Sequence, residues 1–113
     1  MLPKENRLKK EKEFEAVFKS GRTLRGKGVF LRYLTNGTAQ TRIGFVVSKK
    51  ISKLAVERNK VKRRMRDIVR AKKDKLKEGL SIVIVSLPPI KGKTYKEIKE
   101  DIESLLGKEE LIK

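Results

Sequence analysis

The residues with the clearest chemical potential are the Lys and Arg side chains between residues 49 and 77. This segment holds 14 Lys and Arg against three Asp and Glu, a net charge of +11, whereas residues 94–113 carry a net charge of −2. Cations concentrated in one part of a chain bind the closely spaced phosphates of a nucleic acid, while a surface that serves only solubility mixes both signs. The segment therefore predicts a polyanion-binding surface.

On a helix with about 100° between residues, this segment has a basic stripe beside an apolar side. The stripe contains Asn59, whose amide can bond to a phosphate oxygen, a 2′-hydroxyl or a hydrated metal ion. The cations of the stripe are Lys62, Arg63, Arg66, Arg70 and Lys73, with Arg58 beside them. The apolar side consists of Val61, Met65, Ile68 and Leu76, with Val69 at its border. A solvated face is the plainer interpretation of such a helix, but the concentrated charge favours binding.

The composition of the whole chain excludes several classes of protein. Its 113 residues carry a net charge of +17 and include no Cys and no His, which excludes disulfides, thiolate zinc sites and His-dependent catalysis. The longest apolar run, Ile82–Val85, is too short to span a bilayer, and the N-terminus lacks the apolar stretch of a signal peptide. We therefore expect a cytoplasmic protein with a polyanionic partner and no membrane contact.

The hydrophobic pattern predicts six elements within a single domain over residues 1–113. Helices are expected over residues of about 8–19, 55–77 and 94–106, and strands over about 28–35, 42–48 and 80–86. Asn36-Gly37 is a turn signal, so the first two strands are expected to form an antiparallel hairpin. The order α-β-β-α-β-α predicts an α+β fold, a two-layer α/β sandwich with a mixed sheet of at least three strands.

Two aromatic residues of the first expected helix have a spacing that suits nucleic-acid binding. Phe14 and Phe18 are four residues apart and share a helical face, while Phe30 and Arg32 share one face of the first expected strand. Bases of a single strand stack on such rings while a guanidinium meets phosphate. The alternative is that the two Phe side chains only attach the helix to the sheet, and their spacing alone favours this alternative.

Three motifs run through most of the chain. They are the segment from Arg7 to Gly21, the segment Arg42-Ile-Gly-Phe-Val-Val-Ser-Lys-Lys50, and residues 55–66 with Arg58-Asn59 ahead of Lys62-Arg63 and Arg66. Together they resemble the protein subunit of bacterial ribonuclease P, over about residues 6–107. The resemblance implies an α/β sandwich with a left-handed β-α-β crossover, whereas such connections are right-handed by default.

The resemblance also implies a function within a ribonucleoprotein. The family's enzyme is a tRNA 5′-processing endoribonuclease, a hydrolase that removes the 5′ leader of precursor tRNA; its RNA subunit is the catalyst and its protein is not. The implied partners are ribonuclease P RNA and precursor tRNA, with no DNA expected. The implied cofactor is magnesium, bound mainly by the RNA, and no protein ligand set for a metal follows from the sequence.

Site residues follow from the same resemblance. Those implied to contact the catalytic RNA are Lys49, Lys50, Lys53, Arg58, Asn59, Lys60, Lys62, Arg63, Arg66 and Arg70. Those implied to form a cleft for the leader are Phe14, Phe18, Phe30 and Arg32. The resemblance therefore favours a binding role for the two Phe side chains over a purely structural one.

The chain departs from this family at two places. The loop Ile51-Ser52-Lys53-Leu54 lacks the Gly that many relatives have after the Lys pair, and Ser86-Leu87 stands where many carry Arg or Lys after the third expected strand. Lys91 or Lys93 is a candidate to replace that cation. A general RNA-binding protein of ribosomal or nucleoid type, without leader preference, is the alternative that composition does not separate.

Overall fold

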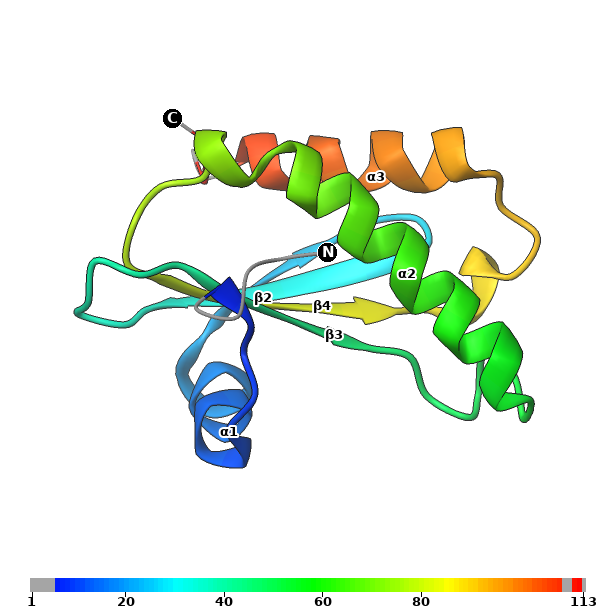
Figure 1. Cartoon of the computed structure of the whole chain (residues 1–113), viewed down its shortest axis with the longest axis horizontal. Coiled ribbons are helices and arrows are strands. Elements are labelled where there is room, and N and C mark those ends of the chain that lie inside the picture. The colour runs from blue at the N-terminus through cyan, green and yellow to red at the C-terminus, as the bar shows by residue number, and fades with distance from the viewer. Residues whose placement is uncertain (1–5, 109–110, 113) are drawn as a thin grey trace.

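The computed structural model describes residues 6–108 and 111–112, so the ends of the predicted domain 1–113 lie partly outside the described residues. In chain order, the elements are α1 (Glu11–Ser20), β1 (Arg22–Arg25), β2 (Val29–Thr35), β3 (Arg42–Val46), α2 (Ala55–Ala71), β4 (Leu80–Ser86) and α3 (Tyr95–Gly107), with short 3₁₀ helices at Lys73–Lys75 and Pro88–Ile90. The α2 and α3 helices cover one face of the sheet, and α1 crosses the other (Figure 1). The predicted α+β fold is confirmed, with α1 added on the second face.

The predicted hairpin between the strands now labelled β2 and β3 is wrong, because these two strands do not pair with each other. The sheet order is β1-β2-β4-β3, so β4 lies between β2 and β3, antiparallel to the first and parallel to the second. The physical reason is that Ile82, Val83 and Ile84 are all buried, which requires cover on both faces of β4 and puts it at the centre of the sheet. The sequence analysis also missed the edge strand β1, so the order of elements is α-β-β-β-α-β-α.

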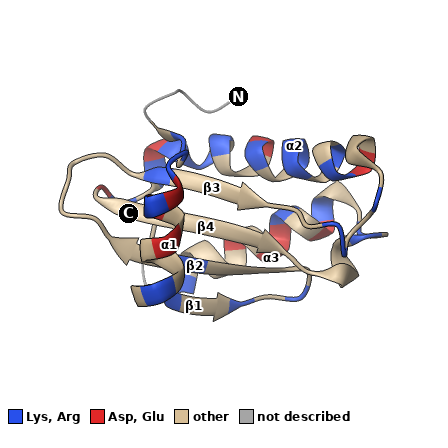
Figure 2. Cartoon of the chain, turned by 90° about the horizontal axis from the view of Figure 1, so that it is seen from below, with Lys and Arg blue, Asp and Glu red and all other residues tan. Residues whose placement is uncertain are grey.

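The connection from β3 through α2 to β4 has the uncommon hand. In Figure 2, with α1 toward the reader, β3 and β4 run parallel as neighbours and α2 lies on the far side of the sheet. When that view is turned so that both strands point upwards, β4 lies to the right of β3 and the helix is behind them. This is a left-handed crossover, so the expected hand is confirmed.

Two helices are shorter than the hydrophobic pattern predicts. The first begins at Glu11, because Leu8 is extended and its N–H donates to the Ile43 carbonyl of β3 at 3.0 Å. The second ends at Ala71, after which the chain turns through a 3₁₀ helix and buries Leu76 outside the helix. Both apolar residues reach a core from irregular backbone, which a helical periodicity cannot distinguish from a helix.

The sheet separates two cores of unequal size. The larger one lies under α2 and α3 and includes Met65, Ile68 and Ile102, all 1% exposed or less. The smaller one lies under α1 and is centred on Leu8, Val17 and Val83. None of the helices in the described ranges combines the length and apolar character that crossing a bilayer needs.

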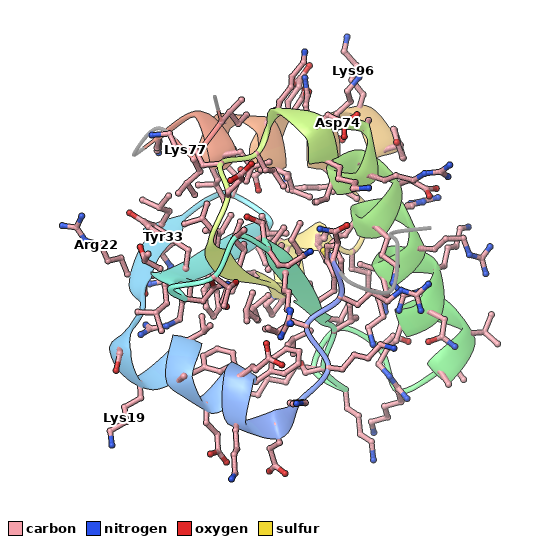
Figure 3. The ribbon with its side chains drawn as sticks, turned by 60° about the vertical axis from the view of Figure 1, so that its left-hand side comes forward. Lys19, Arg22, Tyr33, Asp74, Lys77 and Lys96 are labelled. Carbon is pink, nitrogen blue, oxygen red and sulfur yellow. The ribbon has the colours of Figure 1, made fainter. Side chains whose placement is uncertain are left out.

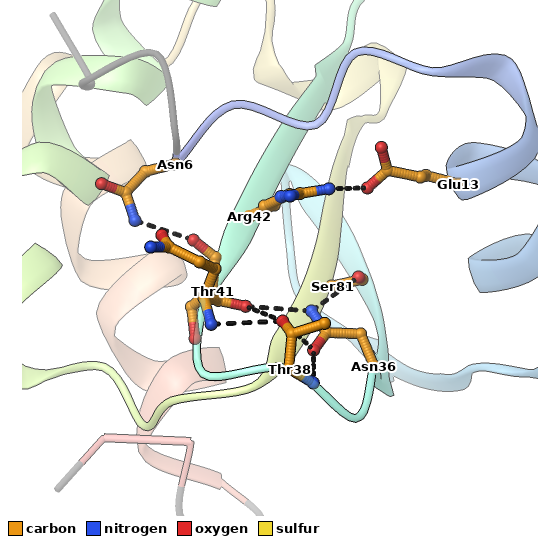
Figure 4. A network of polar contacts seen from close by, with 8 residues as sticks. Asn6, Glu13, Asn36, Thr38, Thr41, Arg42 and Ser81 are labelled. Carbon is orange, nitrogen blue, oxygen red and sulfur yellow. Dashed lines mark hydrogen bonds and ion pairs between the residues drawn. The ribbon is translucent and has the colours of Figure 1, made fainter.

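A polar network fixes one flank of α1 and the loop between β2 and β3 (Figure 4). Asn36 Nδ2 donates to Ser81 Oγ at 3.2 Å, and Asn36 Oδ1 accepts from the Thr38 N–H at 2.9 Å. Arg42 Nη1 lies 3.1 Å from Glu13 Oε2, an ion pair that ties α1 to β3. The helix is therefore anchored on the flank that carries Glu13.

One carboxylate of the α3 helix is bonded to the turn between β1 and β2. Asp101 accepts hydrogen bonds from the backbone N–H groups of Lys27 at 2.9 Å, Gly28 at 2.8 Å and Val29 at 3.2 Å, in the turn between β1 and β2. The helix itself begins at a capping box, in which hydrogen bonds from Thr94 hold the pKa of Glu97 below its usual value. Asp101 thus fixes the turn that orients β1.

Replacing Asp101 with Ala should lower the free energy of unfolding by about 2 kcal/mol, because three N–H groups lose a charged acceptor. Chemical denaturation of the protein measures the change. Glu100→Ala, at an exposed neighbouring carboxylate, is the control and should change stability by less than about 0.5 kcal/mol. Equal effects of the two substitutions would contradict the role given to Asp101.

Candidate nucleic-acid interface

The α2 helix presents its cations on the side away from the sheet. It buries Met65, Ile68 and Val69, so the opposite side faces solvent. The residues left exposed there are Asn59, Lys60, Arg63 and Arg70, and those half-buried at the flanks are Arg58, Lys62 and Arg66. Lys and Arg follow the length of this helix in Figure 2. The structure therefore brings all the α2 residues predicted to contact RNA onto one helix with one buried side.

These cations are not neutralised within the protein. The ion pairs among the described residues, Arg42 with Glu13 and Lys72 with Glu103, involve none of the ten residues predicted to contact the catalytic RNA. Arg58 alone among the ten has a side-chain hydrogen bond within the described ranges, from Nη1 to the Ser52 carbonyl at 2.9 Å. The positive charge of the α2 surface is therefore not compensated by ion pairs within the described part of the protein.

The loop before α2 extends this surface. It is closed without the Gly of many relatives, because Ile51 is buried and its N–H donates to the Ser48 carbonyl at 3.0 Å. Ser52 Oγ donates to Glu57 Oε2 at 2.6 Å and accepts from the Leu54 N–H at 3.1 Å. The three exposed cations of this loop are Lys49, Lys50 and Lys53. A fixed loop thus adds them to the N-terminal end of α2.

A pocket of about 290 Å³ at the outer edge of β3 joins α2 to α1. Its cations are Arg7, Lys9, Lys62 and Arg66, and its aromatic rings are Phe14 and Phe45. Phe14 approaches the strand closely because residue 44 is Gly: a Cβ there would lie 2.5 Å from the end of the ring. Cations predicted to contact the catalytic RNA and an aromatic ring predicted to contact the leader therefore line the same pocket.

The two aromatic residues of α1 share the flank that is not anchored by the ion pair. Val17 is fully buried against the sheet, and helical geometry puts Phe14 and Phe18 about 60° and 100° to one side of it, with Glu13 on the other side. Lys19 projects outward from the same helix (Figure 3). Phe14 is half-buried while Phe18 remains 42% exposed, so its ring is available for contact.

Beside this flank lies a row of side chains across the sheet. The register places Phe30 of β2 opposite Val85 of β4, and Val85 opposite Val46 of β3, and all three are half-buried. Arg25 of β1 is the partner of Phe30 at the other end of the row. Sequence reasoning picked out Phe30 alone, because the remaining members follow from a strand order that the predicted hairpin had wrong.

Arg32 lies on this face but bonds to α1. Its Nη2 donates to the Phe18 carbonyl at 2.6 Å and to the Gly21 carbonyl at 2.9 Å, its Nε to the Val17 carbonyl at 3.3 Å, and its Nη1 to Thr23 Oγ1 at 2.6 Å. The guanidinium thus satisfies carbonyls at the C-terminal end of the helix. Its predicted contact with the leader stays a prediction, and the bonds to α1 are a role that the sequence did not indicate.

Metal-binding side chains do not gather on the described part of the protein. Residues 6–108 and 111–112 contain no group of three or more Cys, His, Asp or Glu side chains that could hold a metal ion.

Comparisons with known proteins identify the family of the chain. The family model described as Ribonuclease P matches residues 2–110. The chain is 41% identical over 113 residues to the ribonuclease P protein component of Pseudanabaena sp., covering 99% of this chain and 97% of the relative, and 37% identical to that of Alkaliphilus metalliredigens, covering 95% and 96%.

Solved structures give the same result for the fold. The RNase P protein of Staphylococcus aureus superposes with a TM-score of 0.87 at 27% identity, covering 96% of this chain and 98% of that one. The protein of Thermotoga maritima, in complex with 1-(4-fluorophenyl)-2-thiourea, superposes with a TM-score of 0.83 at 28% identity, covering 90% and 98%. The chain therefore belongs to the ribonuclease P protein family.

Proposed function

We propose that this protein binds the catalytic RNA of ribonuclease P through α2 and the loop before it, and guides the 5′ leader of precursor tRNA across the α1 face of the sheet. The pocket at the edge of β3 carries the proposal, because it makes the two surfaces continuous. The RNA subunit and its magnesium ions supply the chemistry, and the protein supplies binding. The protein acts in the cytoplasm, where precursor tRNA is the substrate of the assembled enzyme.

The α2 surface contributes affinity through phosphate contacts. Each cation that replaces a counterion on RNA makes binding more favourable at low salt and adds about 0.7 to 0.9 to the slope of log K against log salt. The cations of α2 and its loop are exposed or half-buried and have no carboxylate partner among the described residues. Binding therefore does not require breaking internal ion pairs.

The α1 face contributes selectivity for a single strand. Phe14 and Phe18 offer rings on one flank of the helix, and Phe30, Val85 and Val46 offer an apolar floor beside them. Unpaired bases can stack on such a surface, whereas a duplex keeps its bases inside. This arrangement favours an RNA leader over the folded body of tRNA.

Adding the protein to a bacterial ribonuclease P RNA at low magnesium should restore cleavage of precursor tRNA, while the protein alone should cleave none. Cleavage assays with radiolabelled precursor tRNA measure both. The reconstituted enzyme should also bind tRNA with a leader more tightly than leaderless tRNA. Failure to stimulate the RNA subunit would refute the proposal, and equal affinity for both tRNAs would favour the general RNA-binding alternative.

Arg63→Ala should weaken binding to the RNA subunit, because Arg63 is exposed on α2. If the side chain makes one phosphate contact, as we propose, the salt slope should fall by about 0.7 to 0.9. Filter binding over a range of salt concentrations measures the slope. Lys96→Ala is the control with the same change in charge, at a residue that projects outward from α3 (Figure 3). If both variants lose the same slope, the effect is net charge and the α2 surface is not the docking site.

Phe18→Ala should weaken binding of leader-bearing tRNA by roughly 5-fold to 150-fold, since a stacked base is worth about 1–3 kcal/mol. Binding of leaderless tRNA to the reconstituted enzyme and the melting temperature of the protein should stay unchanged. Ser20→Ala, at an exposed residue on the other flank of α1, is the control. Equal losses for the two tRNAs would make Phe18 a structural residue.

A further inference from the structure

Arg25 and Arg32 lie on the α1 face of the sheet, as does Arg42, which is paired with Glu13, and the protein uses the first two differently. Arg32 donates four hydrogen bonds to Val17, Phe18, Gly21 and Thr23 around the end of α1. Arg25 is exposed, and its side chain has no hydrogen bond or ion pair with any residue that the structure describes. Of the two guanidinium groups, Arg25 is therefore the one with its donors available to a ligand.

The register puts Arg25 in line with the apolar row. Residues directly opposite each other in an antiparallel pair point to the same face, and Arg25 is opposite Phe30. Phe30 is in turn opposite Val85, and Val85 is opposite Val46. A strand of RNA that lies across this row from β3 toward β1 therefore meets the guanidinium of Arg25 at its far end.

The distance across the row determines how long a single strand must be to reach from β3 to Arg25. Because β1 and β3 are the two edges of the sheet, three interstrand spacings separate them, or about 14 Å at about 4.8 Å each. The α2 helix lies near the β3 edge, so the RNA subunit meets the row from that side (Figure 2). A single strand of a few nucleotides is therefore long enough to cross the row.

Two other cations near this edge face elsewhere. Lys27 and Lys93 line a separate pocket with Glu97, Glu100 and Asp101, beside α3. Lys93, a sequence-based candidate for the cation missing at Ser86-Leu87, thus lies among carboxylates. Arg25, by contrast, is directly opposite Phe30 of the apolar row.

We infer that Arg25 forms a phosphate site for the leader, a few nucleotides beyond the part that lies at the edge of β3, and that Arg32 is a positioning residue that holds Phe18 through α1. A guanidinium suits this site because its paired donors match two oxygens of one phosphate. The inference rests on the path proposed above for the leader, and it assigns a phosphate contact at the β1 end of that path.

The test compares Arg25→Gln with Lys27→Gln in the reconstituted enzyme, using precursor tRNAs with leaders of two to ten nucleotides. The two variants lose the same charge two residues apart, on different faces. With leaders of six nucleotides or more, Arg25→Gln should weaken binding about fivefold and lower the salt slope by about 0.7 relative to Lys27→Gln. With leaders of two nucleotides the variants should bind equally, and Arg25→Lys should restore most of the slope.

Arg32→Gln provides the contrasting outcome. It should lower the melting temperature and weaken binding at every leader length, with an unchanged salt slope, because it releases α1 and removes no phosphate contact. If Arg25→Gln and Lys27→Gln match at all lengths, the Arg25 site does not exist. If the unaltered enzyme shows no preference for a leader of any length, the proposed function is wrong and the inference is overturned with it.

Discussion

The burial of β4 on both faces is the constraint on which the rest of the structure depends. Val83 faces α1, while Ile82 and Ile84 face α2 and α3, and all three are 1% exposed or less. A strand with apolar side chains in both directions is stable only between two layers. This requirement holds α2 on one face and α1 on the other, and because α1 is only ten residues long, it covers only part of its face of the sheet.

The concentration of charge on α2 has a cost that a partner can offset. Neighbouring cations repel each other over about 10 Å at 0.1 M salt, and none of those predicted to contact RNA has an ion-pair partner in the described ranges. The helix tolerates this because Met65, Ile68 and Val69 bury its other side in the larger core. Apolar packing therefore fixes the position of a surface whose own electrostatics oppose folding, and phosphate binding relieves that repulsion.

The sequence predicted what depends on neighbours along the chain and missed what depends on pairing across it. The amphipathic pattern of α2 and the β-branched run of β4 were sufficient to locate both elements. The hairpin was wrong because Asn36-Gly37 is a genuine turn, with Gly37 at φ +73°, whose flanking strands each pair with a strand that comes later. Val46, Val85 and Arg25 could not be recognised as one row without that register.

A comparison of Arg25 and Arg32 shows where composition stops being informative. Both side chains are guanidinium groups on the α1 face of the sheet. Arg32, however, lies beneath the end of α1, where carbonyls without helical partners accept its hydrogen bonds. Arg25 is one strand further out and makes no hydrogen bond to those carbonyls. Whether a cation stabilises the fold or remains available to an RNA thus depends on the acceptors that the chain places beside it. That placement is set by the strand order rather than by the motif in which the residue occurs.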